Sequence, residues 1–139
     1  MARTVNEVMT HDPRTVSPSD TLVDAARIMR DDDVGDVLVV EDGRLVGIIT
    51  DRDIVVRAVA DGRDPSSTQV GDICTRDPQT LSPDQSEEDA IRLMREWDVR
   101  RAPVVQDGRP VGIVSLGDVA VDRDSDSVLA DISAASPNN

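Results

Sequence analysis

The stretch GIITDRD, residues 47–53, reveals how this chain is organised, because a close copy returns 65 positions later as GIVSLGD, residues 112–118. Each copy has a glycine, two aliphatic residues, a hydroxyl residue, two variable residues and an aspartate. Shifting the whole sequence by 65 positions aligns residues 5–58 with residues 70–123 without a gap, and about 24 of the 54 aligned positions are identical. Such identity at a fixed period indicates two structural units of one fold.

The hydrophobic pattern around the first copy predicts the elements of repeat 1. Residues 5–10 are expected to form a short helical lead-in and residues 14–16 a short strand. Ser19 or Asp20 is expected to cap a helix that ends near Asp31. The apolar residues at helical spacing in this helix are Leu22, Ala25, Ala26 and Met29. These patterns place one amphipathic helix between the first strand and the signature.

Two aliphatic runs flank Asp42-Gly43 and predict a β-hairpin of residues 36–41 and 44–50 with a two-residue turn. A second helix is expected from about residue 51 to residue 60, with Gly62 near its end. Repeat 2 copies this order. Its expected elements are a helix at about 85–97, a strand at 101–106, a turn at Asp107-Gly108, a strand at 109–115 and a helix at 116–122.

The sequence therefore predicts a mixed α/β (α+β) fold with the order β-α-β-β-α in each repeat. A unit of about 60 residues is close to the lower limit for a stable lone domain, so the two repeats are expected to pack together and share a core. The expected boundaries are repeat 1 at 1–62, a linker at 63–69, repeat 2 at 70–122 and an acidic tail at 123–139.

The net charge of the chain limits the classes of molecule that it can bind. The formal net charge is −13, and an acidic surface repels both nucleic acid and anionic membranes. No apolar run approaches the roughly 18 to 20 residues of a membrane helix. The N-terminal residues 1–10 lack the apolar core of a signal peptide, and the single Cys cannot form an internal disulfide. We therefore expect a cytoplasmic protein that binds neither nucleic acid nor membrane.

The repeated hydroxyl-x-x-Asp signature lies where a strand passes into a helix. Unpaired backbone N–H groups and the helix dipole favour an anion such as a phosphate there. The hydroxyl of Thr50 can donate to a phosphate or sugar oxygen, and the carboxylate of Asp53 can accept from two vicinal hydroxyls, as a ribose offers. The competing interpretation is a helix cap, in which Thr50 and Asp53 bind each other's backbone. The local pattern leaves both interpretations open.

The repeat, the hairpin with D-G-x-x-V-G, the T-V-x-P before the first helix and the G-h-h-[ST]-x-x-D ending (h, aliphatic) together resemble a tandem pair of CBS domains, named for cystathionine β-synthase. The resemblance covers about residues 5–122, and TDRDIVVRAVADGRDP, residues 50–65, is typical of small stand-alone bacterial and archaeal members. It implies two clefts, related by pseudo-two-fold symmetry, for AMP, ADP, ATP or S-adenosylmethionine. It also implies a homodimer of two modules.

The resemblance also implies which residues bind the ligand. The signature residues would contact phosphate and ribose, the first-strand segments would border the base, and basic residues before the next strand would reach phosphate. The signature residues are Thr50, Asp53, Ser115 and Asp118. The residues of the first-strand segments are Val16 and Leu81, and the basic residues are Arg100 and Arg101. Repeat 1 carries Gly35 and Asp36 in place of the two arginines, which predicts inequivalent clefts because a carboxylate disfavours phosphate.

The remaining reactive residues do not form a catalytic or metal-binding constellation in the sequence. There is one His, one Cys and no Lys, which excludes a Cys/His zinc cluster, a P-loop and a Schiff base within one chain. His11 aligns with Arg76 and is expected to face solvent, whereas Cys74 aligns with Met9 and is expected to be buried. Trp97 is expected either in a core or at a dimer interface.

These observations lead to a non-catalytic sensor that requires no cofactor and no metal. It would bind an adenosyl ligand and pass its occupancy to a regulated protein partner that the sequence does not identify. The alternative hypothesis is a dimeric interaction scaffold with vestigial clefts, which the acidic surface and the Gly35-Asp36 pair favour.

Overall fold

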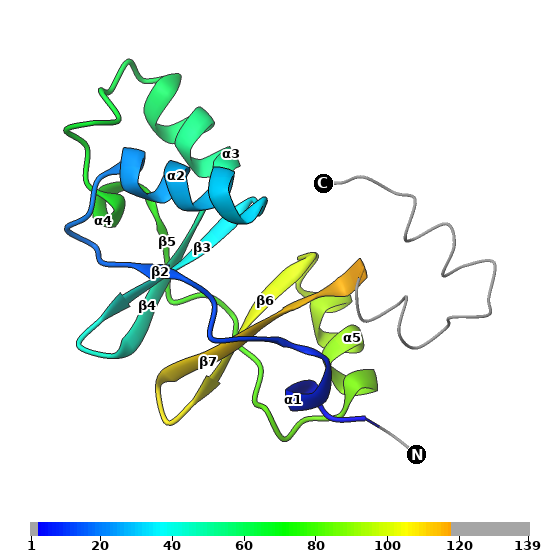
Figure 1. Cartoon of the computed structure of the whole chain (residues 1–139). Coiled ribbons are helices and arrows are strands. Elements are labelled where there is room, and N and C mark those ends of the chain that lie inside the picture. Colours follow the sequence, from blue (N-terminus) through cyan, green and yellow to red (C-terminus); the bar gives the residue numbers. More distant parts are fainter. Residues whose placement is uncertain (1–2, 118–139) are drawn as a thin grey trace. The chain divides into compact units, whose positions relative to one another are not determined.

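The structure is a computed structural model that describes residues 3–117 (Figure 1). Its elements are α1 (Val5–Val8), β1 (Thr10–His11), β2 (Thr15–Val16), α2 (Leu22–Asp32), β3 (Asp36–Glu41), β4 (Arg44–Thr50), α3 (Asp51–Asp53), the π-helix η1 (Ile54–Val59), α4 (Val70–Ile73), β5 (Thr75–Arg76), α5 (Glu87–Glu96), β6 (Arg101–Gln106) and β7 (Arg109–Ser115). Most of these elements follow the predicted order, but the short strands at residues 10–11 and 75–76 were not predicted. The first strand expected in repeat 2 is reduced to an isolated bridge between Leu81 and Val104. The prediction of a mixed helix and strand fold is confirmed. The helix predicted at 116–122 lies largely outside the described residues.

The chain divides into two compact units, and their boundaries cross those of the sequence repeats. One unit, here the α2 unit, contains residues 12–78 and the turn at 107–110. The other, here the α5 unit, contains residues 3–11, 79–106 and 111–117 of the described chain. The beginning of each sequence repeat therefore belongs to the compact unit that is built mainly from the other repeat.

The α2 unit is built on a four-stranded sheet in the order β2-β3-β4-β5. Strand β2 runs parallel to β3, and the β3–β4 and β4–β5 pairs are antiparallel. Helices α2 and η1 lie over this sheet (Figure 1), and the core between them is aliphatic. The residues of α4 and its C-cap that complete this core are Val70, Ile73 and Cys74.

Helix α2 begins one or two residues later than predicted. Thr21, not Ser19 or Asp20, is its N-cap, and the Thr21 hydroxyl accepts a bond from the Asp24 N–H at 3.2 Å. Asp20 instead accepts from the Ser17 N–H at 2.8 Å and closes the turn before the helix. The predicted apolar face was wrong at Ala26, which is exposed. The buried residues of this helix are Leu22, Ala25, Ile28 and Met29.

Both predicted hairpin turns are confirmed by their backbone angles. Asp42 and Gly43 have φ values of 54° and 79°, and Asp107 and Gly108 have values of 55° and 81°. Positive φ at both central residues defines the tight turn whose twist matches antiparallel strands, and Asp-Gly is suited to it. The Asp-Gly pairs therefore form the turns of both hairpins, and in the first hairpin the register shifts once, between Val39 and Val40.

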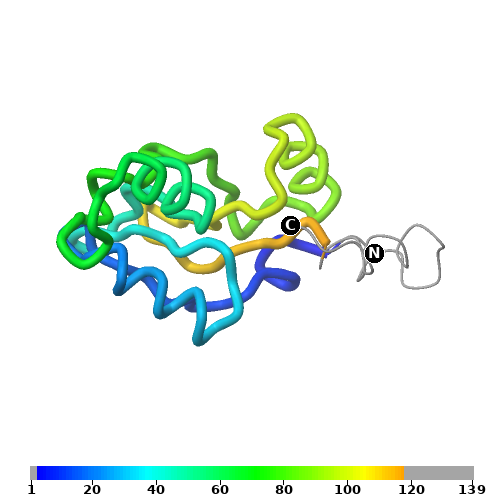
Figure 2. The backbone as a smooth tube through the Cα atoms, turned by 90° about the horizontal axis from the view of Figure 1, so that it is seen from above, coloured from blue at the N-terminus to red at the C-terminus, as the bar shows by residue number. Residues whose placement is uncertain are grey.

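The α5 unit has a three-stranded sheet in the order β1-β7-β6. Figure 2 shows the N-terminal segment, in dark blue, beside the orange end of β7. Strands β1 and β7 are antiparallel, with Thr10 opposite Ile113. Ser86 caps α5 by accepting a bond from the Asp89 N–H at 3.0 Å. Trp97 is half-buried and packs against the core of this unit, which agrees with the core alternative for this residue.

One helix was predicted after β4, and the helical segment has an unexpected form. Three residues of α3 are followed by six residues of π-helix, in which the Ala60 N–H donates to the Val55 carbonyl at 2.9 Å. Ala58 of η1 is fully buried and Ile54 packs against the same core. Within residues 3–117, no helix is both long and apolar enough to cross a membrane.

Candidate functional site

The first signature forms a reciprocal hydrogen-bonded box at the junction of β4 and α3. The Asp53 N–H donates to the Thr50 hydroxyl oxygen at 3.0 Å, and the Thr50 N–H donates to the Asp53 carboxylate at 3.1 Å. The guanidinium of Arg57, one turn later, lies 3.9 Å from the other carboxylate oxygen of Asp53. The capping interpretation is therefore realised in the structure. Arg57 is a neighbour that the sequence pattern did not single out.

This box leaves hydrogen-bonding capacity for a ligand. The Thr50 hydroxyl accepts one bond and retains its own proton to donate, because a hydroxyl is a donor with two acceptor lone pairs. An ionised carboxylate offers about four lone-pair sites, and the Asp53 side chain remains 14% exposed. Capping and ligand binding by Thr50 and Asp53 are thus compatible, since the cap holds both groups in fixed positions.

The loop before each hairpin is joined to the residue that follows the hydroxyl residue of the signature. In the α2 unit the Asp51 N–H donates to the Gly35 carbonyl at 2.9 Å, and in the α5 unit the Leu116 N–H donates to the Arg100 carbonyl at 2.7 Å. These two bonds are equivalent under the shift of 65 residues. The bond brings Arg100 next to the second signature, whereas the first signature has Gly35 beside the carboxylate of Asp51.

The charges at these two loops therefore differ in sign, although Arg57 also lies beside Asp53 at the first signature. A β-carbon on Gly35 would lie 3.2 Å from a carboxylate oxygen of Asp51, so this acid faces the loop closely. Arg100 is exposed at the corresponding position of the α5 unit, and Arg101 is half-buried at the start of β6. A phosphate is attracted by a guanidinium and repelled by a carboxylate, so the Arg100 loop favours an anion more than the Gly35 loop.

The second signature is described only in part. Ser115 is the last residue of β7 and is half-buried, as Thr50 is at the end of β4. Asp118, the carboxylate of this copy, lies outside the described residues. The structure therefore places the hydroxyl of the second signature and the arginine next to it.

The first-strand residues lie in the cores. Val16 is 4% exposed and belongs to the core of the α2 unit, and Leu81 is 2% exposed and belongs to the core of the α5 unit. Leu81 is held from both sides by the backbone, because its N–H donates to Pro103 at 2.9 Å and its carbonyl accepts from Val105 at 2.8 Å. Any contact of these segments with a ligand would therefore come mainly from their backbone and neighbouring side chains.

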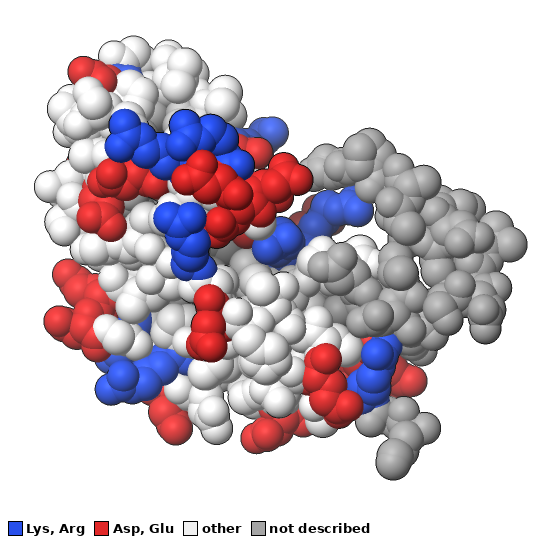
Figure 3. Space-filling view, in the orientation of Figure 1, with Lys and Arg blue, Asp and Glu red and all other residues white. Residues whose placement is uncertain are grey.

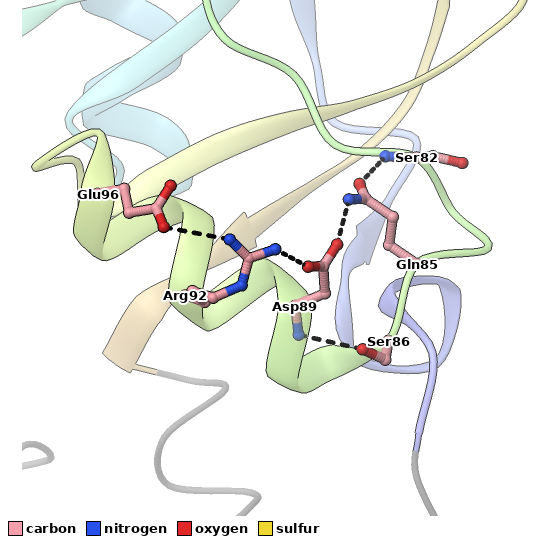
Figure 4. Close-up of polar contacts among 6 residues, drawn as sticks. All are labelled: Ser82, Gln85, Ser86, Asp89, Arg92 and Glu96. Carbon is pink, nitrogen blue, oxygen red and sulfur yellow. Dashed lines mark hydrogen bonds and ion pairs between the residues drawn. The ribbon is translucent and has the colours of Figure 1, made fainter.

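A polar network anchors the segment after Leu81 to α5 (Figure 4). The Ser82 N–H donates to the Gln85 side-chain oxygen at 2.6 Å, and the Gln85 amide donates to Asp89 at 2.6 Å. Arg92 pairs with Asp89, and with Glu96 at 3.1 Å. The hydrogen bonds from Arg92 and then Gln85 hold the pKa of Asp89 below its ordinary value. The segment is therefore fixed before any ligand arrives.

Cys74 and His11 lie as predicted, buried and exposed respectively. Burial raises the pKa of the Cys74 thiol, and the charge of Arg76 opposes this only in part. Within residues 3–117 no three His, Cys, Asp or Glu side chains are grouped so that they could hold a metal ion. Neither residue is thus part of such a group in the described chain.

Cys74 is expected to react at least tenfold more slowly with a thiol reagent at pH 8 in the native protein than in urea. The thiolate is the reactive species, and burial disfavours it. Because the thiol has a higher pKa in the folded state, its protonated form contributes to the free energy of unfolding. This contribution is fully present below the thiol pKa of the unfolded chain, about 8.5, and is lost as the pH rises through the thiol pKa of the folded protein. Absorbance of the released thiol-reagent chromophore measures the rates, and equal rates in the two states would contradict a buried thiol.

The comparisons with known proteins agree with this geometry. The family model of the CBS domain matches residues 5–59 and residues 70–121. The chain is 42% identical over 133 residues to the CBS domain-containing protein YhcV of Bacillus subtilis, covering 93% of this chain and 94% of that protein. It is 35% identical over 118 residues to hypoxic response protein 1 of Mycobacterium tuberculosis, covering 84% of this chain and 82% of that protein.

Solved structures give the same result. The crystal structure of CBSX2 in complex with AMP matches with a TM-score of 0.75 and 30% identity, covering 86% of this chain and 95% of that chain. The structure of Hypoxic Response Protein I with two coordinated zinc ions matches with a TM-score of 0.77 and 34% identity, covering 85% and 97%. The chain is thus a regulatory module made of two repeats. It belongs to the CBS-domain family, as a tandem pair in a small protein.

Proposed function

We propose that this protein is a non-catalytic sensor that binds an adenosyl ligand through its two signatures. The observation that carries the proposal is the box at the β4–α3 junction, which holds the Thr50 hydroxyl and the Asp53 carboxylate together with bonds of 3.0 and 3.1 Å. A hydroxyl donor next to a carboxylate acceptor fits the phosphate and vicinal hydroxyls of a nucleotide. The relative CBSX2, solved with AMP, supports this ligand class.

The candidate ligands are AMP, ADP, ATP and S-adenosylmethionine, and Ser115 and Asp118 would act in the second copy as Thr50 and Asp53 do in the first. Arg100 and Arg101 would supply positive charge for phosphate next to Ser115. Val16 and Leu81 would border the base through their segments. The chain has no Phe and no Tyr, so the base would lie against aliphatic side chains and backbone groups.

The sensor would act as a homodimer and pass its state to a regulated protein in the cytoplasm. A ligand changes such an assembly only if it binds two packings of the dimer with different affinity. The relatives include a CBS-CP12 protein that is described as hexameric, which supports self-association in proteins of this architecture. The net charge of −13 argues for protein partners and against nucleic acid or anionic lipid.

The test is a thermal-shift and calorimetric titration with AMP, ADP, ATP and S-adenosylmethionine. A ligand that binds the native state raises the melting temperature by mass action. We expect a shift in the wild type that is lost in Asp118→Asn or in Asp53→Asn. Asp24→Asn is the matched control, because Asp24 closes the same kind of capping box on α2.

Asp53→Asn keeps a side-chain oxygen that can accept from the Thr50 N–H but removes the negative charge at the start of the helical segment, so it is expected to cost at most about 1 kcal/mol of stability. The shift is therefore measured relative to each variant's own unliganded melting temperature. Wild-type protein that is folded and unmoved by all four ligands would contradict the sensor. An equal shift in wild type and in both signature variants would contradict the assigned residues.

A second function, a dimeric interaction scaffold with ligand-free clefts, is favoured by one specific contrast. The carboxylate of Asp51 faces the Gly35 loop at the first signature, where a phosphate would need positive charge. The scaffold predicts that partner binding is unchanged in Asp53→Asn and Asp118→Asn. Pull-down of a partner by the wild type but not by these variants would favour the sensor.

A further inference from the structure

Arg57 of η1 joins the first signature to helix α4 through two different nitrogen atoms. Its Nη1 donates to the Ile73 carbonyl at 3.0 Å, and its Nε lies 3.9 Å from Oδ1 of Asp53. Ile73 is the last residue of α4 and is 2% exposed, so Arg57 binds one of the carbonyls that a helix leaves unpaired at its end. Because the guanidinium is planar and rigid, this anchor gives it a defined position beside the carboxylate.

The contact between Arg57 and Asp53 differs from the exposed ion pairs of the chain. In Figure 3 basic and acidic side chains lie side by side on the face that is drawn. The pair of Arg30 and Asp31 is exposed on both sides, with side-chain exposures of 72% and 47%, and pairs of this kind contribute little to stability. The Asp53 side chain is only 14% exposed, so the protein rather than the solvent determines how its carboxylate is oriented.

The two oxygens of the Asp53 carboxylate have different surroundings. Oδ2 accepts from the Thr50 N–H at 3.1 Å, which anchors one side of the group. Oδ1 faces Arg57 at 3.9 Å, a separation longer than a hydrogen bond. Arg57 therefore attracts Oδ1 and restricts the rotation of the carboxylate, while the lone pairs of Oδ1 stay available to the hydroxyls of a ligand.

The arginine is not part of the duplicated pattern. Under the shift of 65 residues Arg57 corresponds to Asp122, which lies outside the described residues. The sequence thus has an acid in repeat 2 where repeat 1 has this base. Any effect of Arg57 on binding is therefore a property of the first signature and distinguishes it from the second.

We propose that Arg57 is a positioning residue of the first signature, which orients Asp53 so that the site selects adenosyl ligands that carry both ribose hydroxyls. The inference rests on the proposed function, because it requires that Asp53 accepts from the ribose. Hydrogen bonds weaken steeply as their angle departs from linearity, so a carboxylate that turns about its single anchor at Thr50 accepts poorly from two hydroxyls at once. Arg57 acts through Asp53 and does not itself touch the ligand.

The experiment measures the dissociation constants of AMP and 2′-deoxy-AMP by calorimetry and compares their ratio among full-length variants. The wild type is expected to bind AMP about tenfold more tightly, as for one hydrogen bond to a charged group. In Arg57→Leu this preference is expected to fall to about threefold or less, toward the value of Asp53→Asn. A structural role alone would weaken both ligands alike and leave the ratio unchanged.

Arg63→Leu is the matched control for Arg57→Leu. It removes the same charge shortly after η1, together with an ion pair to α4, since Arg63 lies 3.9 Å from the carboxylate of Asp72. This pair does not involve Asp53, so the control is expected to keep the wild-type ratio. The double variant Arg57→Leu/Asp53→Asn completes a cycle, in which the loss of Arg57 is expected to change nothing once the carboxylate is gone.

A wild-type ratio in Arg57→Leu would overturn the positioning role of Arg57. An equal fall in Arg63→Leu would overturn it too, because the loss of charge would then be the cause. A double variant with a lower ratio than Asp53→Asn alone would show that Arg57 does not act through Asp53. A wild type that binds neither ligand, or does not distinguish them, would contradict the contact of Asp53 with ribose and the positioning role with it. A preference lost in Asp53→Asn but kept in Arg57→Leu would leave the sensor intact and overturn the role of Arg57 alone.

Discussion

Gly112→Ala is expected to lower the free energy of unfolding by about 3 kcal/mol, the upper range for overpacking a well-filled interior. Gly112 lies in β7 opposite His11 of β1. A β-carbon there would lie 2.7 Å from the Thr10 carbonyl oxygen and would also collide with the Met9 side chain. The Thr10 oxygen belongs to a paired strand, so it cannot move without breaking the β1–β7 pairing.

The same effect is expected at Gly47, the glycine of the first signature. Its β-carbon would lie 2.8 Å from the Thr75 carbonyl oxygen of β5. Both signature glycines are therefore required because another strand passes close to them, whereas the hydroxyl and the aspartate of the signature serve other purposes. This separates the structural part of the signature from its candidate binding part.

Urea denaturation at constant pH measures the free energy of unfolding of each variant. An unchanged slope of this free energy against urea concentration shows that the folding transition itself is unchanged. Gly117→Ala is the control in the same unit, because the nearest atom to its β-carbon is 3.9 Å away, and its effect is expected to stay within about 0.5 kcal/mol. Met9→Ala added to Gly112→Ala is not expected to restore stability, because the Thr10 carbonyl remains. A Gly112→Ala protein as stable as the control would show that β1 does not pass β7 so closely.

Arg3→Thr is expected to cost about 2 kcal/mol of stability because it leaves a buried carboxylate without its cation. Glu87 is 5% exposed, and Arg3 lies 3.3 Å from its carboxylate. Removing one partner of a fully buried pair typically costs about 3 to 5 kcal/mol. The smaller value applies here because the Arg3 side chain keeps 37% of its exposure.

The chain itself contains the control for this ion pair. Under the shift of 65 residues, Arg3 and Glu87 correspond to Thr68 and Leu22, which are 6% and 0% exposed. The backbone bonds are the same, since the Glu87 N–H donates to the Arg3 carbonyl at 2.8 Å and the Leu22 N–H donates to the Thr68 carbonyl at 3.0 Å. One repeat therefore uses an ion pair where the other uses a hydroxyl residue and an aliphatic side chain.

The double variant Arg3→Thr/Glu87→Leu copies the apolar solution and is expected within about 1 kcal/mol of the wild type, because replacing a whole buried pair is often neutral. Urea denaturation of the wild type, the two single variants and the double variant completes the cycle. A double variant less stable than Arg3→Thr alone would contradict the interpretation that the buried carboxylate is the source of the loss.

Much of the secondary structure followed from short patterns. Asp42-Gly43 and Asp107-Gly108 predicted both hairpin turns because few sequences tolerate positive φ at two consecutive residues. The α2 N-cap was predicted one or two residues early because Ser19, Asp20 and Thr21 all carry a side chain that can accept a backbone bond. Only the folded chain shows that Asp20 is used by the Ser17 N–H, which leaves Thr21 for the helix.

The candidate site was predicted in part. The duplicated hydroxyl-x-x-Asp pattern at the end of a strand singled out Thr50, Asp53 and Ser115 as candidates, and their binding role stays a prediction. The sequence did not identify Arg57 or Asp51, because only the folded strand–helix junction brings Arg57 close to Asp53 and Asp51 close to Gly35. It also did not show that Val16 and Leu81 lie within cores, since an aliphatic residue in a short strand gives no information about which neighbours cover it.

The sequence by itself determined the duplication, the order of the elements, both hairpin turns and the family, because these depend on periodicity and on residues with narrow backbone preferences. The tertiary structure decided which parts pack together. Val70, Ile73 and Cys74 complete the core of the α2 unit, and Val5 and Met9 complete the core of the α5 unit. No local pattern reveals this exchange, because the apolar face of an amphipathic segment does not specify which copy of a duplicated fold it packs against, and only the folded chain shows this.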